Sequence, residues 1–216
     1  MNKIKAIILD FDGTLGDTTD VIIRTIQATI KELGLPSRTD AECAAMIGLR
    51  LTDTPPALFP EENVDINKYA STYRRLFHTF NSDGAVRIYP HVMETLTELK
   101  NRGMILTIAS SRSHSTLDDY VMKLGFSDLI SLVIGAEDVS EGKPSPEAVN
   151  MTLQQLYIKA EEALVVGDTS FDIDMGRNAG AKTCGVTYGN GTIESLSNAD
   201  WLIDDFSRLL ELTELA

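Results

Sequence analysis

Three short aliphatic runs in the chain end at acidic or hydroxyl-bearing residues. The runs and the residues that follow them are 4–9 before Asp10 and Asp12, 104–109 before Ser110 and Ser111, and 163–166 before Gly167 and Asp168. Near-continuous aliphatic runs separated by helix-length amphipathic segments are typical of buried strands in a parallel sheet. Because ligands bind beyond the carboxyl ends of the strands in such sheets, we expect these polar groups to gather at one edge. The pattern predicts an active site there.

The spacing of apolar residues separates a wholly helical insert from a part that contains strands. In the insert, apolar residues recur every three or four positions and no strand-like run occurs. Beyond it, strands and helices alternate, which implies a parallel sheet with right-handed crossovers. The predicted fold is therefore α/β: a Rossmann-like parallel-sheet core at 1–16 and 85–216, with an inserted all-helical cap domain at 17–84.

Local patterns predict the individual elements. In the cap, the expected helices are 21–33, a segment that starts with a capping box at 39–42 and runs to 47, and 66–80, with prolines interrupting the pattern at 55–60. In the core, the expected helices are 91–101, 113–124, 145–156, 171–179 and 206–214, and the further strands are 132–134, 182–186 and 201–203. Ser145 is expected to cap its helix, with Pro146 at the first helical position.

The composition excludes several classes of partner. The formal net charge is −13, so the chain repels nucleic-acid backbones and anionic membrane surfaces. Cys43 and Cys184 lie far apart in apolar surroundings and are expected to be buried free thiols. The first apolar run meets Asp10 too early for a signal peptide, and no run is long enough to span a membrane. The cytoplasm is therefore the expected compartment, and the glycosylation sequon at Asn190 is expected to be unused.

Asp10 and Asp12 lie two residues apart just after a buried strand. In an extended chain both side chains project to the same side. Two carboxylates about 4 Å apart repel each other by about 1–4 kcal/mol, and Asp168 adds to the repulsion. A divalent cation relieves it, and a few carboxylates with water and phosphate oxygens suit Mg²⁺. The alternative is that the Asp12-Gly13 pair forms an ordinary turn.

Other residues near the strand ends have two interpretations each. Ser110 and Ser111 precede a helix, where hydroxyls and free N–H groups form a phosphate cradle or simply a helix cap. Pro144 favours an extended backbone at Lys143, which can direct its amine toward the strand ends or leave it in solvent. Asp172 either complements a helix dipole or orients the metal and its water molecules.

Taken in order, these segments resemble the four motifs of the haloacid dehalogenase superfamily. The matching residues are 10–15 (Asp-Phe-Asp-Gly-Thr-Leu), Ser110, Lys143 with Pro144, and Gly167-Asp168 with Asp172. The resemblance spans the whole chain and includes a helical cap after the first motif, as in the subgroup that is similar to phosphoglycolate phosphatases. Gly16 and His91 depart from the residues that are common in relatives.

The resemblance implies a role for each residue that contacts the substrate. Asp10 is the expected nucleophile, which forms an aspartyl-phosphate. Asp12 is the expected general acid that protonates the leaving oxygen, and then the base that activates water. Ser110, with Ser111 beside it, is expected to bind the phosphoryl group, and Lys143 to neutralise it. Phosphoryl transfer depends chiefly on such positioning and charge neutralisation.

The resemblance also implies Mg²⁺ as the cofactor. The expected ligands are the Asp10 carboxylate, the main-chain carbonyl of Asp12 and the Asp168 carboxylate, with Asp172 supporting them from a second layer. A cap of this kind closes over the strand ends and selects the substrate. Within the cap, Arg50 is a candidate to bind a carboxylate or second phosphate, or is a solvated arginine at a helix end.

The expected function is that of a Mg²⁺-dependent phosphatase of small phosphomonoesters such as phosphoglycolate. Asp12 argues against dehalogenase chemistry, because members that cleave carbon–halogen bonds lack that residue. A phosphosugar mutase similar to β-phosphoglucomutase and a pyrophosphatase remain as enzymatic alternatives, and a receiver-like phospho-switch as a non-enzymatic one. The expected partner is a small phosphorylated metabolite, with no nucleic acid or membrane, and the chain is expected to be a monomer or homodimer.

Overall fold

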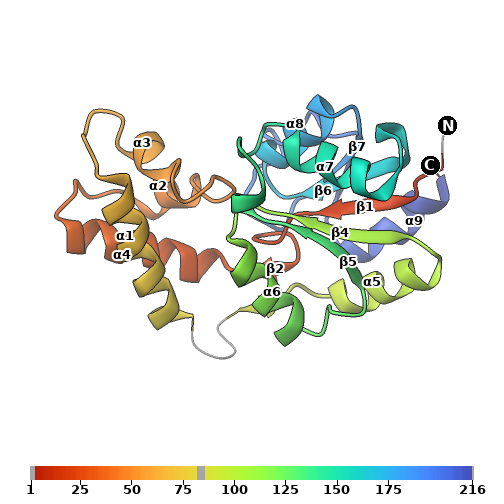
Figure 1. The fold of residues 1–216 in the computed structure, drawn as a ribbon, viewed down its shortest axis with the longest axis horizontal. Helices are drawn as coiled ribbons and strands as arrows, with labels where there is room; N and C mark the ends of the chain where they lie inside the picture. Colours follow the sequence, from red (N-terminus) through yellow and green to blue (C-terminus); the bar gives the residue numbers. More distant parts are fainter. Residues whose placement is uncertain (1–2, 82–85, 216) are drawn as a thin grey trace.

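A six-stranded parallel sheet forms the centre of the molecule (Figure 1). The computed structural model describes residues 3–81 and 86–215. The strands of the sheet are β1 (Ala6–Leu9), β4 (Ile105–Ala109), β5 (Ile130–Ile134), β6 (Ala163–Gly167), β7 (Lys182–Val186) and β8 (Trp201–Ile203). Their order across the sheet is β5-β4-β1-β6-β7-β8, and every adjacent pair is parallel. The prediction that the three aliphatic runs form strands of one parallel sheet is confirmed, and the structure shows that these strands, β4, β1 and β6, are neighbours.

Helices cover both faces of this sheet (Figure 1). The core helices are α5 (Val92–Asn101), α6 (His114–Lys123), α7 (Glu147–Leu156), α8 (Ser170–Asn178) and α9 (Leu209–Leu215), with 3₁₀ helices at Ala136–Asp138, Ala160–Glu162 and Phe206–Arg208. Successive side chains of β1 point to opposite faces of the sheet. Ile7 and Leu9 belong to the cluster that includes α5, α6 and α9, whereas Ile8 belongs to the cluster that includes α7 and α8. All three are fully buried, as the aliphatic sequence of a two-sided strand requires.

The inserted segment forms a separate helical lobe, the cap (Figure 1). Its helices are α1 (Thr19–Leu33), α2 (Asp40–Ala44), α3 (Thr54–Leu58) and α4 (Ile66–Phe80). Its buried residues form a cluster distinct from those around the sheet, and include Ile26, Tyr69 and Phe77. The predicted capping box is present, because Thr39 accepts from the Glu42 amide and Glu42 accepts from Thr39. The predicted boundary between 84 and 85 lies outside the described residues.

Three local expectations are wrong. Residues 54–58 were expected only to interrupt the helical pattern, but they form α3, because proline is tolerated in the first turn of a helix. The insert was expected to start without a strand, but β2 (Gly16–Asp17) pairs antiparallel with β3 (Arg87–Ile88). The N-cap of α7 is Pro146 instead of Ser145. The differences thus concern two short elements that were not expected, α3 and the β2–β3 pair, and the first residue of α7.

The strand order places the site. The connections from β1 and from β6 run toward opposite edges of the sheet, so the order reverses between these two neighbouring strands. A crevice at such a reversal, outside the carboxyl ends of the strands, is where open α/β sheets bind ligands. Cys43 and Cys184 are buried free thiols, as predicted. Among the described residues, no helix is both long and apolar enough to cross a bilayer.

Candidate active site

Asp10, Ser110 and Asp168 each follow directly on the last residue of a strand, β1, β4 and β6. The amide of Asp10 donates to the Val166 carbonyl at 2.9 Å, and the amide of Ser110 donates to the Ile134 carbonyl at 3.0 Å. These two bonds continue the sheet ladder for one residue past β1 and β4. The side chains are therefore positioned by the sheet itself, and they lie at the edge that the sequence predicts.

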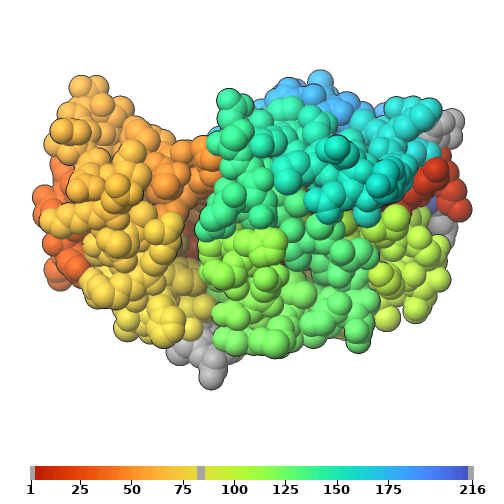
Figure 2. Space-filling model, viewed as in Figure 1, coloured from red at the N-terminus to blue at the C-terminus, as the bar shows by residue number. Residues whose placement is uncertain are grey.

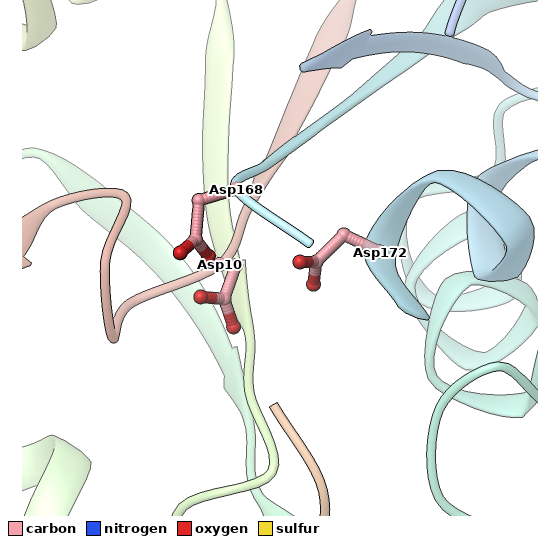
Figure 3. Close-up of side chains that lie close together, drawn as sticks. All are labelled: Asp10, Asp168 and Asp172. Atoms are coloured by element: carbon pink, nitrogen blue, oxygen red, sulfur yellow. The ribbon is translucent and has the colours of Figure 1, made fainter. Parts of the chain in front are cut away.

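Three carboxylates converge at the carboxyl ends of β1 and β6 (Figure 3). Asp10, Asp168 and Asp172 each offer an oxygen, and these oxygens all lie within 4.8 Å of one another. Their exposed fractions are 5%, 0% and 1%. Asp172 comes from the first turn of α8, where its Oδ2 accepts from the amide and the hydroxyl of Thr169 at 3.0 and 2.7 Å. A capping interaction thus fixes the direction of this carboxylate.

Lys143 is the cation of this cluster. Its Nζ donates to Oδ1 of Asp10 at 2.5 Å and to Oδ1 of Asp172 at 2.6 Å, with the lysine only 8% exposed. Burial alone lowers the pKa of the lysine, but the two carboxylates outweigh burial and raise it. The ammonium therefore stays charged. One buried positive charge facing three carboxylates still leaves an excess of negative charge.

Burial, together with this excess, shifts the pKa values of Asp10 and Asp168 upward. Burial raises the pKa of Asp10 well above its usual range; Lys143 lowers it, and the neighbouring carboxylates raise it further. Burial, together with Asp172, raises the pKa of Asp168 to about 7, although hydrogen bonds from Asn190 lower it. Hard carboxylate oxygens with excess negative charge fit a divalent cation such as Mg²⁺.

Asn190 holds Asp168 in place, a contact that the sequence pattern did not indicate. Its amide and its Nδ2 donate to Oδ2 of Asp168 at 2.7 and 2.8 Å, and Thr14 Oγ1 lies 3.4 Å from Oδ1. Asn190 Oδ1 accepts from the Thr19 hydroxyl at 2.8 Å, and Thr19 is the first residue of cap helix α1. The available signal was the position of Asn190 in a Gly-rich turn after the predicted strand 182–186.

The turn after Asp12 requires glycine. Gly13 has φ +90°, and a Cβ there would lie 2.1 Å from Oδ2 of Asp168. Any larger residue would have to displace that carboxylate. The Asp-Gly pair is therefore both a turn, as the simpler interpretation holds, and a close approach of the backbone to the acidic cluster.

The Asp12 carboxylate is bound by Arg112 and is not among the three converging side chains. Nε of Arg112 donates to Oδ2 at 3.0 Å and Nη2 donates to Oδ1 at 2.5 Å. The Asp10 and Asp12 side chains were expected to approach one centre. Asp10 lies in the acidic cluster, whereas the Asp12 side chain is bound to Arg112 instead. The predicted metal contact of Asp12 is its main-chain carbonyl, which this side-chain geometry does not test. No sequence motif indicated Arg112, although it lies two residues after a strand-end serine.

A cavity of about 810 Å³ lies between the cap and the core. Its lining includes Asp10, Asp12, Ser110, Ser111 and Arg112 from the core and Gly48, Arg50, Tyr73 and Phe77 from the cap. In Figure 2 the cap, orange to yellow, meets the green part of the core along a narrow seam. The site therefore opens into a space that the two lobes enclose together.

Two predicted site residues connect the lobes across this seam. Ser111 Oγ donates to the Gly48 carbonyl of the cap at 2.6 Å. Arg50 donates through Nε to Asp53 at 2.8 Å and through Nη1 to the Ser140 carbonyl of the core at 2.9 Å. Both line the cavity. Their predicted roles in binding phosphate and in selecting substrate stay predictions.

The sequence and fold resemble known proteins along nearly the full chain. Residues 7–186 match the family model described as haloacid dehalogenase-like hydrolase. The chain is 30% identical to a phosphoglycolate phosphatase of Vibrio cholerae, with 98% of each chain covered. It is 32% identical to pyrophosphatase PpaX of Anoxybacillus flavithermus, with 97% of each covered. A haloacid dehalogenase-like family hydrolase from Streptococcus pneumoniae superimposes with a TM-score of 0.85 at 25% identity, with 100% of both chains covered.

Proposed function

The chain belongs to the haloacid dehalogenase-like hydrolases and is a phosphoric ester hydrolase, and from this premise we propose a Mg²⁺-dependent phosphatase of small phosphomonoesters such as phosphoglycolate. The observation that carries the proposal is the buried contact of Lys143 with Asp10 beside Asp168 and Asp172. Because the chain is an enzyme of this family, the receiver-like alternative is set aside.

In the first half of the proposed reaction, a carboxylate oxygen of Asp10 attacks phosphorus. The Asp10–phosphorus bond forms as the bond to the leaving oxygen breaks, and Asp12 gives its proton to that oxygen. Lys143 orients Asp10 and neutralises the phosphoryl oxygens, and Ser110 donates a hydrogen bond to the phosphoryl group. These steps need charge neutralisation and alignment, which a buried lysine and rigid strand ends supply.

In the second half, Asp12 accepts a proton from water as the water oxygen attacks the aspartyl-phosphate. The Asp10–phosphorus bond breaks, inorganic phosphate leaves, and the Asp10 carboxylate is restored. Two easier displacements thereby replace one difficult one. The cap reduces access of bulk water to the intermediate.

Asp10 and Asp168 would hold Mg²⁺, with the Asp12 carbonyl as a further predicted ligand and Asp172 supporting the group. The ion, when bound, supplies positive charge to the phosphoryl oxygens. Without it, the excess negative charge of the cluster would repel a phosphate ester. Activity is therefore expected to require the cation.

A pyrophosphatase is the second candidate, favoured by the relative named pyrophosphatase PpaX. Pyrophosphate offers the same phosphoryl group with phosphate as the leaving group, so the same residues would serve. The phosphosugar mutase alternative needs a sugar phosphate and a bisphosphate primer, and would give an isomer without free phosphate.

The test is phosphate release from phosphoglycolate, glucose 1-phosphate, a nucleoside monophosphate and pyrophosphate, with Mg²⁺ and with a chelator. We expect Mg²⁺-dependent release, fastest with the natural class of substrate, and none from Asp10→Asn. Trapping of a phosphoenzyme in the wild type but not in Asp10→Asn checks the intermediate. Full activity of Asp10→Asn, or release that is indifferent to Mg²⁺, contradicts the proposal.

A further inference from the structure

Arg112 occupies the carboxylate that the proposed mechanism needs free. Its two N–H groups bind both oxygens of Asp12, at 3.0 and 2.5 Å. With both oxygens held by Arg112, the Asp12 carboxylate is not free to contact a leaving oxygen. The pair must therefore open before Asp12 can act as an acid.

The surroundings of Arg112 limit what can open the pair. The side chain is 9% exposed, and its guanidinium lies 4.8 Å from the Phe77 ring of the cap and 5.2 Å from the Tyr120 ring of the core. Burial opposes the charge, but Asp12 outweighs burial and raises the pKa of Arg112, which stays cationic. A buried guanidinium without an anion is strongly unfavourable. Release of Asp12 thus requires another anion in the cavity.

The shape of the guanidinium indicates which anion. Its planar fork binds a carboxylate or phosphate through two parallel hydrogen bonds, as it binds Asp12. Arg50, a candidate for this task in the sequence, already binds Asp53 and the Ser140 carbonyl. Arg112 lines the cavity between Ser111 and the cap, next to the residues expected to hold the transferring phosphoryl group.

We propose that Arg112 is the receptor for a second acidic group on the leaving portion of the substrate, and that this group displaces Asp12 and frees it for catalysis. The inference rests on the proposed function and narrows its substrate class to diacidic phosphate compounds. A substrate with a neutral leaving portion binds equally well whether Asp12 is paired with Arg112 or released. Such a substrate therefore leaves the Asp12–Arg112 pair closed. Selectivity thereby arises from release of the acid as well as from binding.

The kinetic test compares phosphoglycolate with its amide, phosphoglycolamide, which keeps the size but loses the carboxylate charge. The wild type is expected to prefer phosphoglycolate by about 10- to 100-fold in kcat/KM, the equivalent of a charged hydrogen-bond pair. In Arg112→Met this ratio falls toward one, and Arg112→Lys retains part of it. The loss on phosphoglycolate is expected chiefly in KM, because Arg112→Met removes the receptor for the substrate carboxylate and at the same time leaves Asp12 unpaired.

Arg75→Met is the matched control. Arg75 is likewise an arginine paired with a carboxylate, but it lies on α4 of the cap and contacts Glu32 on the exposed surface, at 2.5 Å. This variant is expected to keep the wild-type ratio. Equal losses on both substrates in Arg112→Met and Arg112→Lys overturn the proposal, since they indicate a purely structural role.

A binding experiment separates this proposal from the proposed function. Asp10→Asn with Mg²⁺ is titrated calorimetrically with phosphoglycolate and with the amide, alone and combined with Arg112→Lys or Arg112→Met. The receptor role is supported if phosphoglycolate binds more tightly than the amide and this preference is lost when Arg112 is replaced. This holds even if the enzyme turns over no phosphate ester, and in that case only the proposed function fails. Turnover without any such preference overturns the receptor role alone.

Discussion

At the scale of single residues, Lys143 is the most sensitive position for stability. Its ammonium is the buried partner of Asp10 and Asp172. Lys143→Met therefore leaves these two buried carboxylates without their positively charged partner. We expect a loss of about 3–5 kcal/mol in the free energy of unfolding at neutral pH without Mg²⁺, measured by urea denaturation. Lys31→Met, which removes an exposed cap lysine, is the control and is expected to have little effect. A loss below about 1 kcal/mol, the range of a surface pair, contradicts a buried pair.

Asn190 is the second sensitive residue, because it fixes a predicted metal ligand. Asn190→Ala removes the Nδ2 bond to Asp168 and the bond from Thr19. Loss of a residue that orients a ligand lowers metal affinity by about 10- to 100-fold, and we expect that range for Mg²⁺. The measurement is the rise in melting temperature across a Mg²⁺ titration, with the exposed Asn150→Ala as control. An unchanged midpoint contradicts the role of Asn190.

The aspartates were predictable because each follows an aliphatic run whose end the sequence displays. Arg112 and Asn190 were not, because their partners are distant in sequence. Arg112 lies 100 residues from Asp12, and Asn190 lies 22 residues from Asp168. Their roles depend on the direction of a side chain in a loop, which no periodicity encodes. A resemblance between motifs identifies reacting groups but not the residues that hold them.

At the scale of elements, α6 carries a pH-sensitive contact at its first residue. A hydrogen bond with Asp138 raises the pKa of His114, whereas burial lowers it. The charges of Asp118 and Glu137 raise it further. Because the pKa of His114 is higher in the folded than in the unfolded state, the protonated ring stabilises the fold. This stabilisation is complete below the unfolded-state pKa, near 6.5, and is lost as the pH rises through the folded-state pKa.

The variant His114→Gln tests this contact. Its melting temperature should lie below that of the wild type at about pH 6, with the difference shrinking at about pH 9. The ring is 41% exposed, so the effect is expected to be small and to weaken in high salt. A difference that grows with rising pH contradicts the assignment.

Elements with several residues in a regular pattern were predictable, and the shortest were not. Strands β7 and β8, of five and three residues, have the predicted bounds. Strands β2 and β3 have two residues each, too few to display a period. The helix α3 was hidden because Pro55 was interpreted as a breaker, whereas it lies in the first turn.

At the scale of the whole molecule, the acidic cluster lies where three parts of the structure meet. The strand order reverses between β1 and β6, and the cap covers the cavity beyond the carboxyl ends of these strands. Ser111 and Arg50 join the lobes through the Gly48 and Ser140 carbonyls. Stability, cation binding and cap position are therefore coupled through one small region.

This coupling gives a prediction for the stability of the entire chain. Burial and the neighbouring carboxylates raise the pKa of Asp10, so its ionised form destabilises the fold at any pH above the unfolded value near 3.9. Asp10→Asn removes that charge, and its amide oxygen can still accept the bond from Lys143. Without Mg²⁺ at neutral pH, we expect this inactive variant to melt at a higher temperature than the wild type.

With saturating Mg²⁺, the difference in melting temperature between the two proteins is expected to shrink or change sign. The reason is that the cation stabilises the wild type more than Asp10→Asn. A ligand at 100 times its Kd stabilises the folded state by about 2.7 kcal/mol. Differential scanning calorimetry of both proteins, with chelator and with Mg²⁺, measures the two differences. A chelated Asp10→Asn that melts below the wild type would show that Lys143 fully compensates the carboxylates. The cluster would then need no cation for stability, and the physical argument for a metal at this site would be lost.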